Sequence, residues 1–456
     1  MNSALRERIY QKYIHPIERT PQPYVGAEFE YPVINWDKLP VSIPALQETV
    51  KAFSAKFHFT EQKADADGNL YSLTNPENGD NLSFDCSFNT LELSFGREAS
   101  IHVLNQRFHD YFTFLKKELS KHRHTITGMG VNPYYQYNNY QPIQNDRYRM
   151  LYKYLHSYKE YDSKTRHDIP EFSMLAAASQ VQLDTSKEQV LLSLNTFNLL
   201  EPFKAVLFAN SYFDKLPDLI ISRDYLWKYS SQGINTHNLD MYDVHFRTID
   251  EYIDYVLTQS MYCVGKDGKY LHFKPIPLTK YFSSEQVTGT YFDDGEWKQY
   301  TFHPELDDLE HLRTFKFSDL TYRGTIEFRS ACEQPISDTF THSAFHAGLS
   351  QKLDELSELL ENDTVLYQHG YNAAELRELF THREYPDFAD RKALSGKLIE
   401  ILNLAESGLK ERGLQEESFL QPLYERAERL TNPALDFWNG IQSGDSLTSW
   451  IEHYSE

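Results

Sequence analysis

The sequence contains few cysteines and no long hydrophobic run. Its 456 residues include three cysteines, Cys86, Cys263 and Cys332, which are widely spaced and odd in number. A disulfide framework is therefore not expected, and a reducing cytoplasm is the expected compartment. The first 16 residues have an amphipathic helical pattern without an apolar signal core, and no run approaches the roughly 18 apolar residues that a membrane span needs.

Positive charge is also scarce. The chain has 45 basic and 66 acidic residues, a formal net charge of −21. Such an acidic surface argues against nucleic acids and anionic membranes as partners. A phosphate-bearing small molecule remains possible if metal cations or a few placed arginines accompany it. Hydrophobic residues make up 40% of the chain, which is enough for a substantial core.

Two common catalytic signatures are missing. The sequence contains no G-x-x-x-x-G-K-[ST] motif, which excludes a P-loop, and no G-x-S-x-G motif of a nucleophile elbow. Nucleotide chemistry, if present, must therefore use another arrangement of side chains.

Predicted strands and helices are mixed without a regular βαβ alternation. Alternating apolar patterns predict strands over 24–33, 82–95, 125–131, 174–184 and 321–335, and helical spacing predicts helices over 1–16, 108–124 and 187–211. This order favours an α+β fold with a largely antiparallel sheet. After about residue 345 the pattern becomes helical, with a capping box at Asn372 and Glu375 and a helix stop at Gly413. We therefore expect one domain over 1–350 and a helical C-terminal extension over 351–456 that packs on it.

The stretch YVGAEFEYPV, residues 24–33, places two carboxylates on one side of a predicted strand. Successive side chains point to opposite faces, so four apolar or aromatic positions share one face, and Glu28 and Glu30 share the other. The two glutamates repel each other. Water or a cation should compensate for this repulsion.

Polar side chains opposite an apolar face recur on other predicted strands. They are Asp85 and Glu92, Gln180 and Gln182, and Glu327 and Arg329. Asp85 and Glu92 are seven residues apart, so a turn or bulge near residues 87–89 is needed for both to face one cleft. Oxygen ligands without a histidine or cysteine cluster suit Mg²⁺ or Mn²⁺, and five carboxylates suit two or three ions. Several such ions on a sheet could hold a nucleoside triphosphate.

Residues 134–161 contain nine tyrosines. They could form a loop and a helix that pack with large side chains. They could also form a lid or wall over a ligand.

At this point the sequence resembles glutamate–cysteine ligases, in their plant-type and actinobacterial branch, within the glutamine-synthetase-like carboxylate–amine ligases. The stretches that carry the resemblance occur in the family's order over roughly residues 20–350 and include GAEFEYP, NTLELSF, GMGVNP, SQVQLD, LEPFKAVLFANS, SRDYLWKYS and TYRGTIEFRSACEQP. The resemblance implies a curved, mainly antiparallel sheet flanked by helices. It also implies that ATP phosphorylates the γ-carboxylate of glutamate and that the amine of cysteine then displaces phosphate, the first step of glutathione biosynthesis.

The resemblance also assigns roles residue by residue. Metal ligands are expected at Glu28, Glu30, Asp85, Glu92, Gln180 and Glu327. Arg329 and Glu327 are expected to act in catalysis, Arg329 and Gln182 to contact ATP, and Arg223 and Arg147 to bind an amino-acid substrate. The implied cofactor is Mg²⁺, in two or three ions that Mn²⁺ can replace, with ATP as co-substrate. The expected partners are ATP, glutamate and cysteine, and the chain is expected to be a monomer or a homodimer.

Three alternatives stay open from the sequence. A ligase of the same mechanism could use another amino acid or amine acceptor. A glycoside hydrolase could use paired carboxylates and aromatic side chains without ATP. A binding protein could keep the fold and the acidic ligands without turnover.

Overall fold

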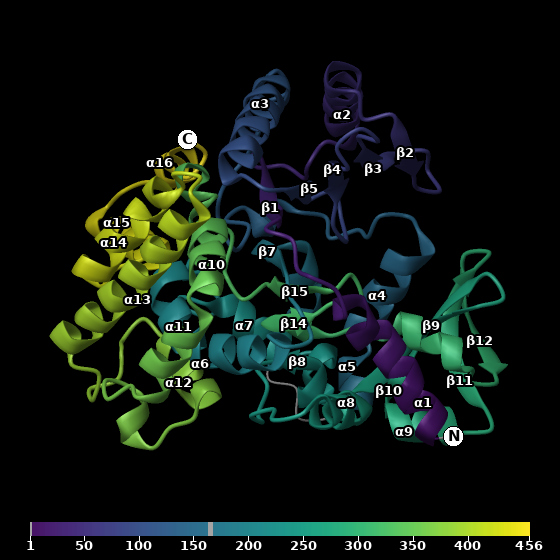
Figure 1. Ribbon diagram of the computed structural model, residues 1–456. Helices are drawn as coiled ribbons and strands as arrows, with labels where there is room; N and C mark the ends of the chain where they lie inside the picture. The colour runs from purple at the N-terminus through teal and green to yellow at the C-terminus, as the bar shows by residue number, and fades with distance from the viewer. Residues whose placement is uncertain (1, 163–166) are drawn as a thin grey trace.

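A nine-stranded sheet forms the centre of the computed structural model, which describes residues 2–162 and 167–456 (Figure 1). In spatial order its strands are β14 (Ser318–Leu320), β15 (Thr325–Phe328), β7 (Ser179–Asp184), β1 (Val25–Asn35), β5 (Thr90–Glu98), β4 (Asn81–Phe84), β3 (Leu70–Thr74) and β2 (Glu61–Ala64). The short β6 (His124–Ile126) pairs with the far end of β1. Neighbouring strands pair antiparallel throughout, so the predicted α+β fold with a mainly antiparallel sheet is confirmed.

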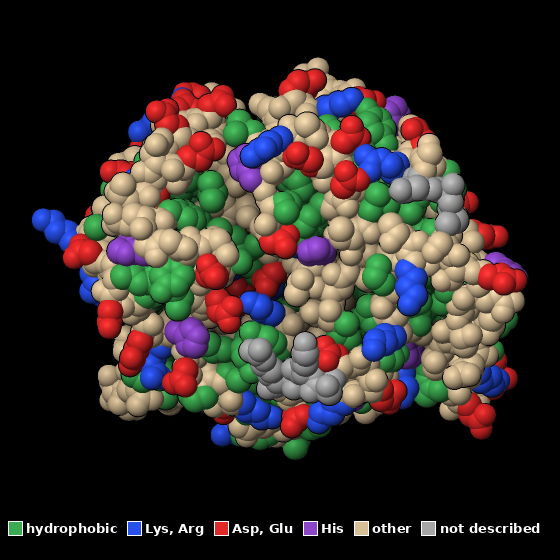
Figure 2. Space-filling view, turned by 90° about the horizontal axis from the view of Figure 1, so that it is seen from below, with side chains coloured by type: hydrophobic (Ala, Val, Ile, Leu, Met, Phe, Trp, Pro, Cys, Tyr) green, Lys and Arg blue, Asp and Glu red, His purple; other side chains and the backbone are tan. Residues whose placement is uncertain are grey.

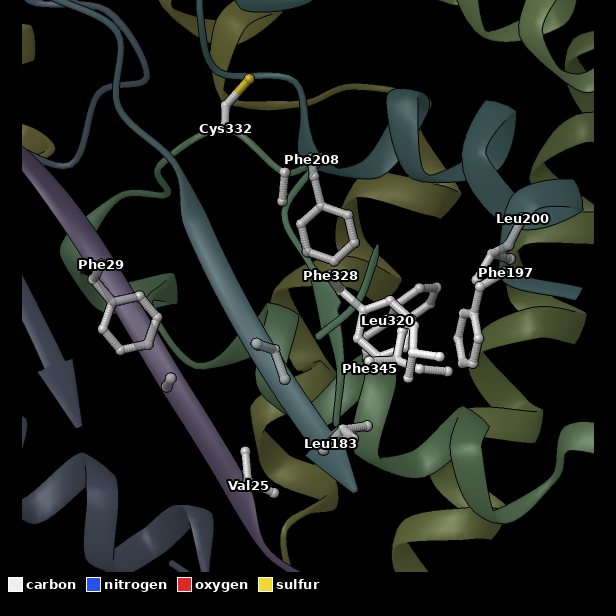
Figure 3. Close-up of a cluster of buried hydrophobic side chains, with 14 of the residues drawn as sticks. Val25, Phe29, Leu183, Phe197, Leu200, Phe208, Leu320, Phe328, Cys332 and Phe345 are labelled. Atoms are coloured by element: carbon white, nitrogen blue, oxygen red, sulfur yellow. The ribbon is translucent and has the colours of Figure 1, made fainter. Parts of the chain in front are cut away.

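One face of the sheet is apolar and is covered by helices. Phe29 of β1 is fully buried and packs against Phe95 of β5, Phe108 of α3 (Ile101–Ser120) and Phe340 just before α10 (Thr341–Gln351). Figure 3 shows a further part of this core, where Phe197 of α6 (Val190–Phe208) lies beside Phe328 of β15. Burial of these rings fixes the orientation of β1, β5 and β15, so the polar residues between the buried ones must face the other side.

A second sheet lies at the right of Figure 1. Its strands are β12 (Glu296–Phe302), β11 (Val287–Asp293), β10 (Lys269–Pro277) and β9 (Ser260–Lys266), in this spatial order. The helix α4 (Asp146–His156) packs on β10 and β11, so the tyrosine-rich stretch lies between this sheet and the first one. A small parallel pair, β8 (Leu239–Asp240) with β13 (Phe315–Lys316), adjoins it.

The chain after residue 350 is helical, as predicted. Its helices are α11 (Leu353–Glu361), α12 (Ala373–Phe380), α13 (Arg391–Arg412), α14 (Gln421–Arg429), α15 (Pro433–Ser443) and α16 (Leu447–His453). The helix α13 crosses α10 at close range, with Gly408 of α13 against Gly348 of α10. A Cβ atom at Gly408 would lie only 1.9 Å from the carbonyl oxygen of Gly348, so this crossing requires a glycine. The helix α12 packs on α6. The capping box of Asn372 and Glu375 and the left-handed stop at Gly413 are both present.

The remaining helices include α1 (Asn2–Ile9), α2 (Ile43–Phe57), α5 (Tyr158–Tyr161), α7 (Ser222–Lys228), α8 (Ile249–Thr258) and α9 (Leu278–Ser283). Two predicted elements differ in extent. The strand expected over 125–131 is reduced to β6 and an isolated antiparallel bridge between Val131 and Ala176, and the segment 82–95 is split into β4 and β5 by a turn. Among the described residues, no helix is long and apolar enough to cross a membrane.

Candidate active site

The polar face of the first sheet brings the predicted acidic residues together. Glu30 on β1 lies opposite Glu92 on β5, and Glu28 lies opposite Gln180 on β7. Glu327 on β15 lies opposite Gln182 in the same way. The alternation in the sequence therefore predicted the shared face correctly, and strand pairing then places residues far apart in the chain side by side.

Three of these carboxylates form a compact group. Each of Glu28, Glu30 and Glu92 offers a carboxylate oxygen, and these three oxygens lie within 4.8 Å of one another. Burial and the neighbouring carboxylates, Asp85 first, raise the pKa of Glu30 to about 8 and the pKa of Glu92 to about 7. The pKa of Glu28 is raised well above its usual range by burial and by Glu92. Negative charge thus accumulates here beyond what the surrounding protein neutralises, as expected for a site that binds cations.

Hydrogen bonds hold the carboxylates in place. The amide Nε2 of Gln180 donates to Oε1 of Glu28 at 2.9 Å and to Oε1 of Glu30 at 3.1 Å. The backbone N–H of Ala178 donates to Glu30 at 2.7 Å, and the hydroxyl of Ser94 donates to Glu92 at 2.9 Å. Gln180 therefore contacts the predicted ligands through its amide nitrogen.

Asp85 reaches the same cavity through a turn after β4. The next residue, Cys86, has a left-handed φ of 58°, and the N–H of Asp85 bonds the carbonyl of Thr90 at the start of β5. The turn changes the direction of the chain between Asp85 and Glu92, so both line the cavity despite their odd spacing. The expectation of a turn in this segment is confirmed.

Glu327 is not among the residues that line the cavity, but it contacts two arginines that do, Arg323 and Arg329. Its Oε1 accepts from Nε2 of Gln182 at 2.8 Å and lies 3.4 Å from a guanidinium nitrogen of Arg323. Its Oε2 accepts from Nη1 of Arg329 at 3.1 Å. Arg323 was not predicted, although it follows the alternation of Thr325, Glu327 and Arg329. A turn at Gly324, with φ of 80°, interrupts the strand there.

A cavity of about 780 Å³ opens above the carboxylates. Its wall includes five arginines, Arg147, Arg223, Arg313, Arg323 and Arg329, of which the last two flank β15. Arg147 and Arg223 were predicted for substrate binding, and both face this space. On the face shown in Figure 2, by contrast, basic side chains are scattered among acidic ones. Local positive charge is thus concentrated beside the carboxylates in an otherwise acidic protein.

The tyrosine-rich stretch supplies one wall of the cavity. Tyr148, Met150 and Leu151 of α4 line it together with Arg147. Other tyrosines of the stretch pack in the interior, for example Tyr154, whose ring stacks 4.3 Å from that of Tyr262. Part of the stretch therefore packs in the interior and part forms a wall of the cavity, and a ligand beneath that wall stays a prediction.

Fold and site together define a sheet-based acidic cavity with arginines on its walls, which is typical of enzymes that bind phosphorylated ligands with divalent cations. No family model matches the chain. The chain is 27% identical to glutamate–cysteine ligase A, chloroplastic, of Oryza sativa subsp. indica over 256 residues, which cover 53% of this chain and 47% of the relative. It is 24% identical to the chloroplastic glutamate–cysteine ligase of Brassica juncea over 323 residues, 69% of this chain and 58% of the relative.

These alignments confirm the resemblance that the sequence motifs indicated. The chain spans about half the length of the curated relatives it matches. Among solved structures, it is similar to a glutamate–cysteine ligase of Francisella tularensis in complex with AMP, with 11% identity, a TM-score of 0.45, and coverage of 95% of this chain and 88% of the other.

Proposed function

We propose that the protein is an ATP- and Mg²⁺-dependent glutamate–cysteine ligase. The observation that carries the proposal is the group of Glu28, Glu30 and Glu92 at the base of a cavity lined by arginines. The names of the plant relatives and the order of the shared motifs support the same assignment. Ligation of glutamate to cysteine is the first step of glutathione biosynthesis.

The acidic residues fit divalent cations. Glu28, Glu30 and Glu92 offer oxygen ligands on paired strands, and their pKa values are raised by burial and by repulsion among the carboxylates, which a bound cation would relieve. Asp85 lines the same cavity, and Glu327 lies on β15, which β7 separates from β1. Five carboxylates would suit two or three Mg²⁺ ions or Mn²⁺ in their place. Bound cations would supply charge neutralisation for the triphosphate and for the transferred phosphoryl group.

The arginines fit the anionic parts of the substrates. Arg329, held by Glu327 at 3.1 Å, would stabilise charge on the transferred phosphoryl oxygens. Gln182, bonded to Glu327, would lie near ATP. Arg223 and Arg147, which both line the cavity, would hold an amino-acid substrate through its carboxylate groups.

The reaction then follows from ordinary acyl chemistry. A γ-carboxylate oxygen of glutamate attacks the γ-phosphorus of ATP, ADP leaves, and an acyl phosphate forms. The amine of cysteine attacks the carbonyl carbon, the C–O bond to phosphate breaks, and the amine proton is lost to base. Phosphorylation is needed because a free carboxylate is a poor electrophile.

The decisive assay combines phosphate release with mass spectrometry of the product. Wild-type protein with ATP, Mg²⁺, glutamate and cysteine should release phosphate and form a γ-glutamyl amide of cysteine, and Glu28→Gln should not. A screen of other amines and acids identifies a ligase of the same mechanism with another substrate. Sugar release that resists chelation of metals would indicate a glycoside hydrolase, and nucleotide binding without any turnover would indicate a binding protein.

We further propose that the protein acts in the cytoplasm as a monomer or homodimer. The three cysteines are all unpaired and buried, which suits a reducing compartment. Size-exclusion chromatography with light scattering measures the oligomeric state directly.

A further inference from the structure

A buried arginine from the helical region after residue 350 contacts the segments that carry two cavity arginines. Arg377 of α12 is 3% exposed. Its Nε bonds Asp224 at 2.8 Å, its Nη1 bonds a carboxylate oxygen of Glu201 at 2.7 Å, and its Nη2 donates to the carbonyl of Ser330 at 3.2 Å. Its guanidinium also stacks on the ring of Phe317, 4.4 Å from the centroid.

Two of these contacts are made to immediate neighbours of cavity arginines. Asp224 follows Arg223 on α7, and both residues line the cavity. Ser330 follows Arg329 at the end of β15. Arg377 therefore holds the side chain of Asp224, next to Arg223, and the backbone carbonyl of Ser330, next to Arg329.

The remaining contacts close the same network. The N–H of Arg329 donates to the carbonyl of Phe317 at 3.0 Å, and Phe317 is the ring on which Arg377 stacks. Arg223 in turn donates from Nη1 to the carbonyl of Ala331 at 3.4 Å. The segment 329–331 therefore connects all three arginines. It contains Arg329, its Ser330 carbonyl accepts from Arg377, and its Ala331 carbonyl accepts from Arg223.

Arg377 acts on the cavity from outside it. It lines a neighbouring cavity of about 310 Å³, which shares Asp224 and Asp240 with the larger one. Its charge is balanced by Asp224 and Glu201, and Glu201 is also bonded by Lys204 at 2.7 Å. A planar guanidinium with several donors can hold a carboxylate on each side and a carbonyl at once, which a lysine ammonium at the same place cannot do.

We propose that Arg377 is a positioning residue, which orients Arg223 and Arg329 toward the substrates through Asp224, Ser330 and Phe317. This proposal rests on the proposed function for its kinetic consequences, and it gives the helices after residue 350 a direct part in the site.

The test compares Arg377 with a matched arginine of the same helical region. Arg426 of α14 is 5% exposed and bonds Leu207, Gln334 and Asp338, none of which lines the cavity. Lysine and glutamine variants are made at both positions. Both glutamine variants should lower the melting temperature, because each breaks a buried network.

The first readout does not depend on catalysis. Phenylglyoxal modifies guanidinium groups, and peptide mass spectrometry reports the modification rates of Arg223 and Arg329 separately. These rates should change severalfold in Arg377→Lys and Arg377→Gln and stay within twofold of wild type in the Arg426 variants. Equal changes in both sets, or none in either, would overturn the proposal.

The second readout is kinetic. Arg377→Gln should lower kcat/KM by about 100-fold, since displacement of a positioned group by about 1 Å has effects of this size. Arg377→Lys should melt closer to wild type but recover little of this loss, and Arg426→Gln should change kcat/KM less than about threefold. Wild-type kinetics in Arg377→Gln would refute the positioning role. Wild-type protein without ligase turnover would refute the proposed function instead, and the modification rates would still decide the role of Arg377.

Discussion

Glu30 of β1 and Glu92 of β5 lie directly opposite each other and present both carboxylates to one cavity. Residues paired in this way have Cβ atoms about 5 Å apart, and like charges at that distance destabilise a sheet. The apolar face of the same strands is fully buried, so the carboxylates cannot turn away. The fold therefore maintains a repulsion that a bound cation would relieve.

Neutralising one carboxylate should stabilise the cation-free protein. Glu28→Gln should raise the unfolding free energy by about 1 kcal/mol without divalent cations, because burial, and then repulsion from Glu92, Glu327 and Glu30, disfavour an ionised carboxylate at this position. The same change should lower turnover by about 100-fold or more. Thermal unfolding with and without MgCl₂ measures the first effect, and the stabilisation by Mg²⁺ should shrink in the variant.

The matched control for this experiment is Glu98→Gln. Glu98 lies on β5 but pairs with Arg107 away from the cavity. Its variant should keep the full response to Mg²⁺. A clear loss of stability in metal-free Glu28→Gln would instead give Glu28 a structural role.

The cation-free protein should lose stability as the pH rises from about 6 to 8. The folded pKa values of Glu30, about 8, and Glu92, about 7, lie above the ordinary glutamate value. The folded state therefore holds more protons than the unfolded state in this range, which costs up to about 1.4 kcal/mol per pH unit for each group as pH increases. Urea unfolding in the presence of a chelator measures the slope.

Two comparisons make the pH experiment specific. In Glu30→Gln, the unfolding free energy should fall less steeply between about pH 6 and pH 8. In wild type with saturating Mg²⁺, the unfolding free energy should instead rise with pH, because cations bind the ionised carboxylates. A slope that is identical in wild type and in Glu30→Gln would show that other groups cause the pH dependence.

Arg223→Ala should affect an amino-acid substrate more than ATP. Loss of a charge-assisted contact to a carboxylate should raise the KM for that amino acid by about 10- to 100-fold, with a smaller change for ATP. Arg323→Ala is the contrasting variant, since Arg323 lies beside Glu327 and Gln182, and it should act mainly on ATP. Steady-state kinetics with each substrate varied in turn measure these KM values. A larger rise in the KM for ATP than for the amino acid in Arg223→Ala would indicate that Arg223 binds the nucleotide.

Phe29→Ala should destabilise the whole domain. The ring is fully buried between β5, α3 and the segment before α10, and such truncations cost about 3–5 kcal/mol. Phe292→Ala, in the partly exposed hairpin of β11 and β12, should cost about 1 kcal/mol or less. Urea unfolding compares the two, and equal small losses would contradict the assignment of the apolar face.

The sequence predicted one side of the sheet well because a period of two is a local property. Glu28 and Glu30 had to share a face once the residues between them were buried. Strand pairing is not local, so the position of Glu30 opposite Glu92 became known only from the structure. The turn that brings in Asp85 depends on a left-handed Cys86, a residue type that gives no turn signal.

Arg323 and Arg377 were not predicted. Arg323 follows the alternation of Thr325, Glu327 and Arg329, but a turn at Gly324 separates it from β15. Arg377 lies in an amphipathic helix far along the chain, and nothing in its local pattern distinguishes it from a surface arginine. The division of the chain near residue 350 stays a prediction, although α12 and α13 pack closely on α6 and α10.

The most direct test of the cation site is a crystal structure with Mn²⁺ and a non-hydrolysable ATP analogue, examined by anomalous scattering. The account predicts manganese peaks at coordination distance, about 2.1 Å, from carboxylate oxygens of Glu28, Glu30 and Glu92, with the triphosphate above them. Manganese and nucleotide bound elsewhere, with these three carboxylates free of metal, would contradict it.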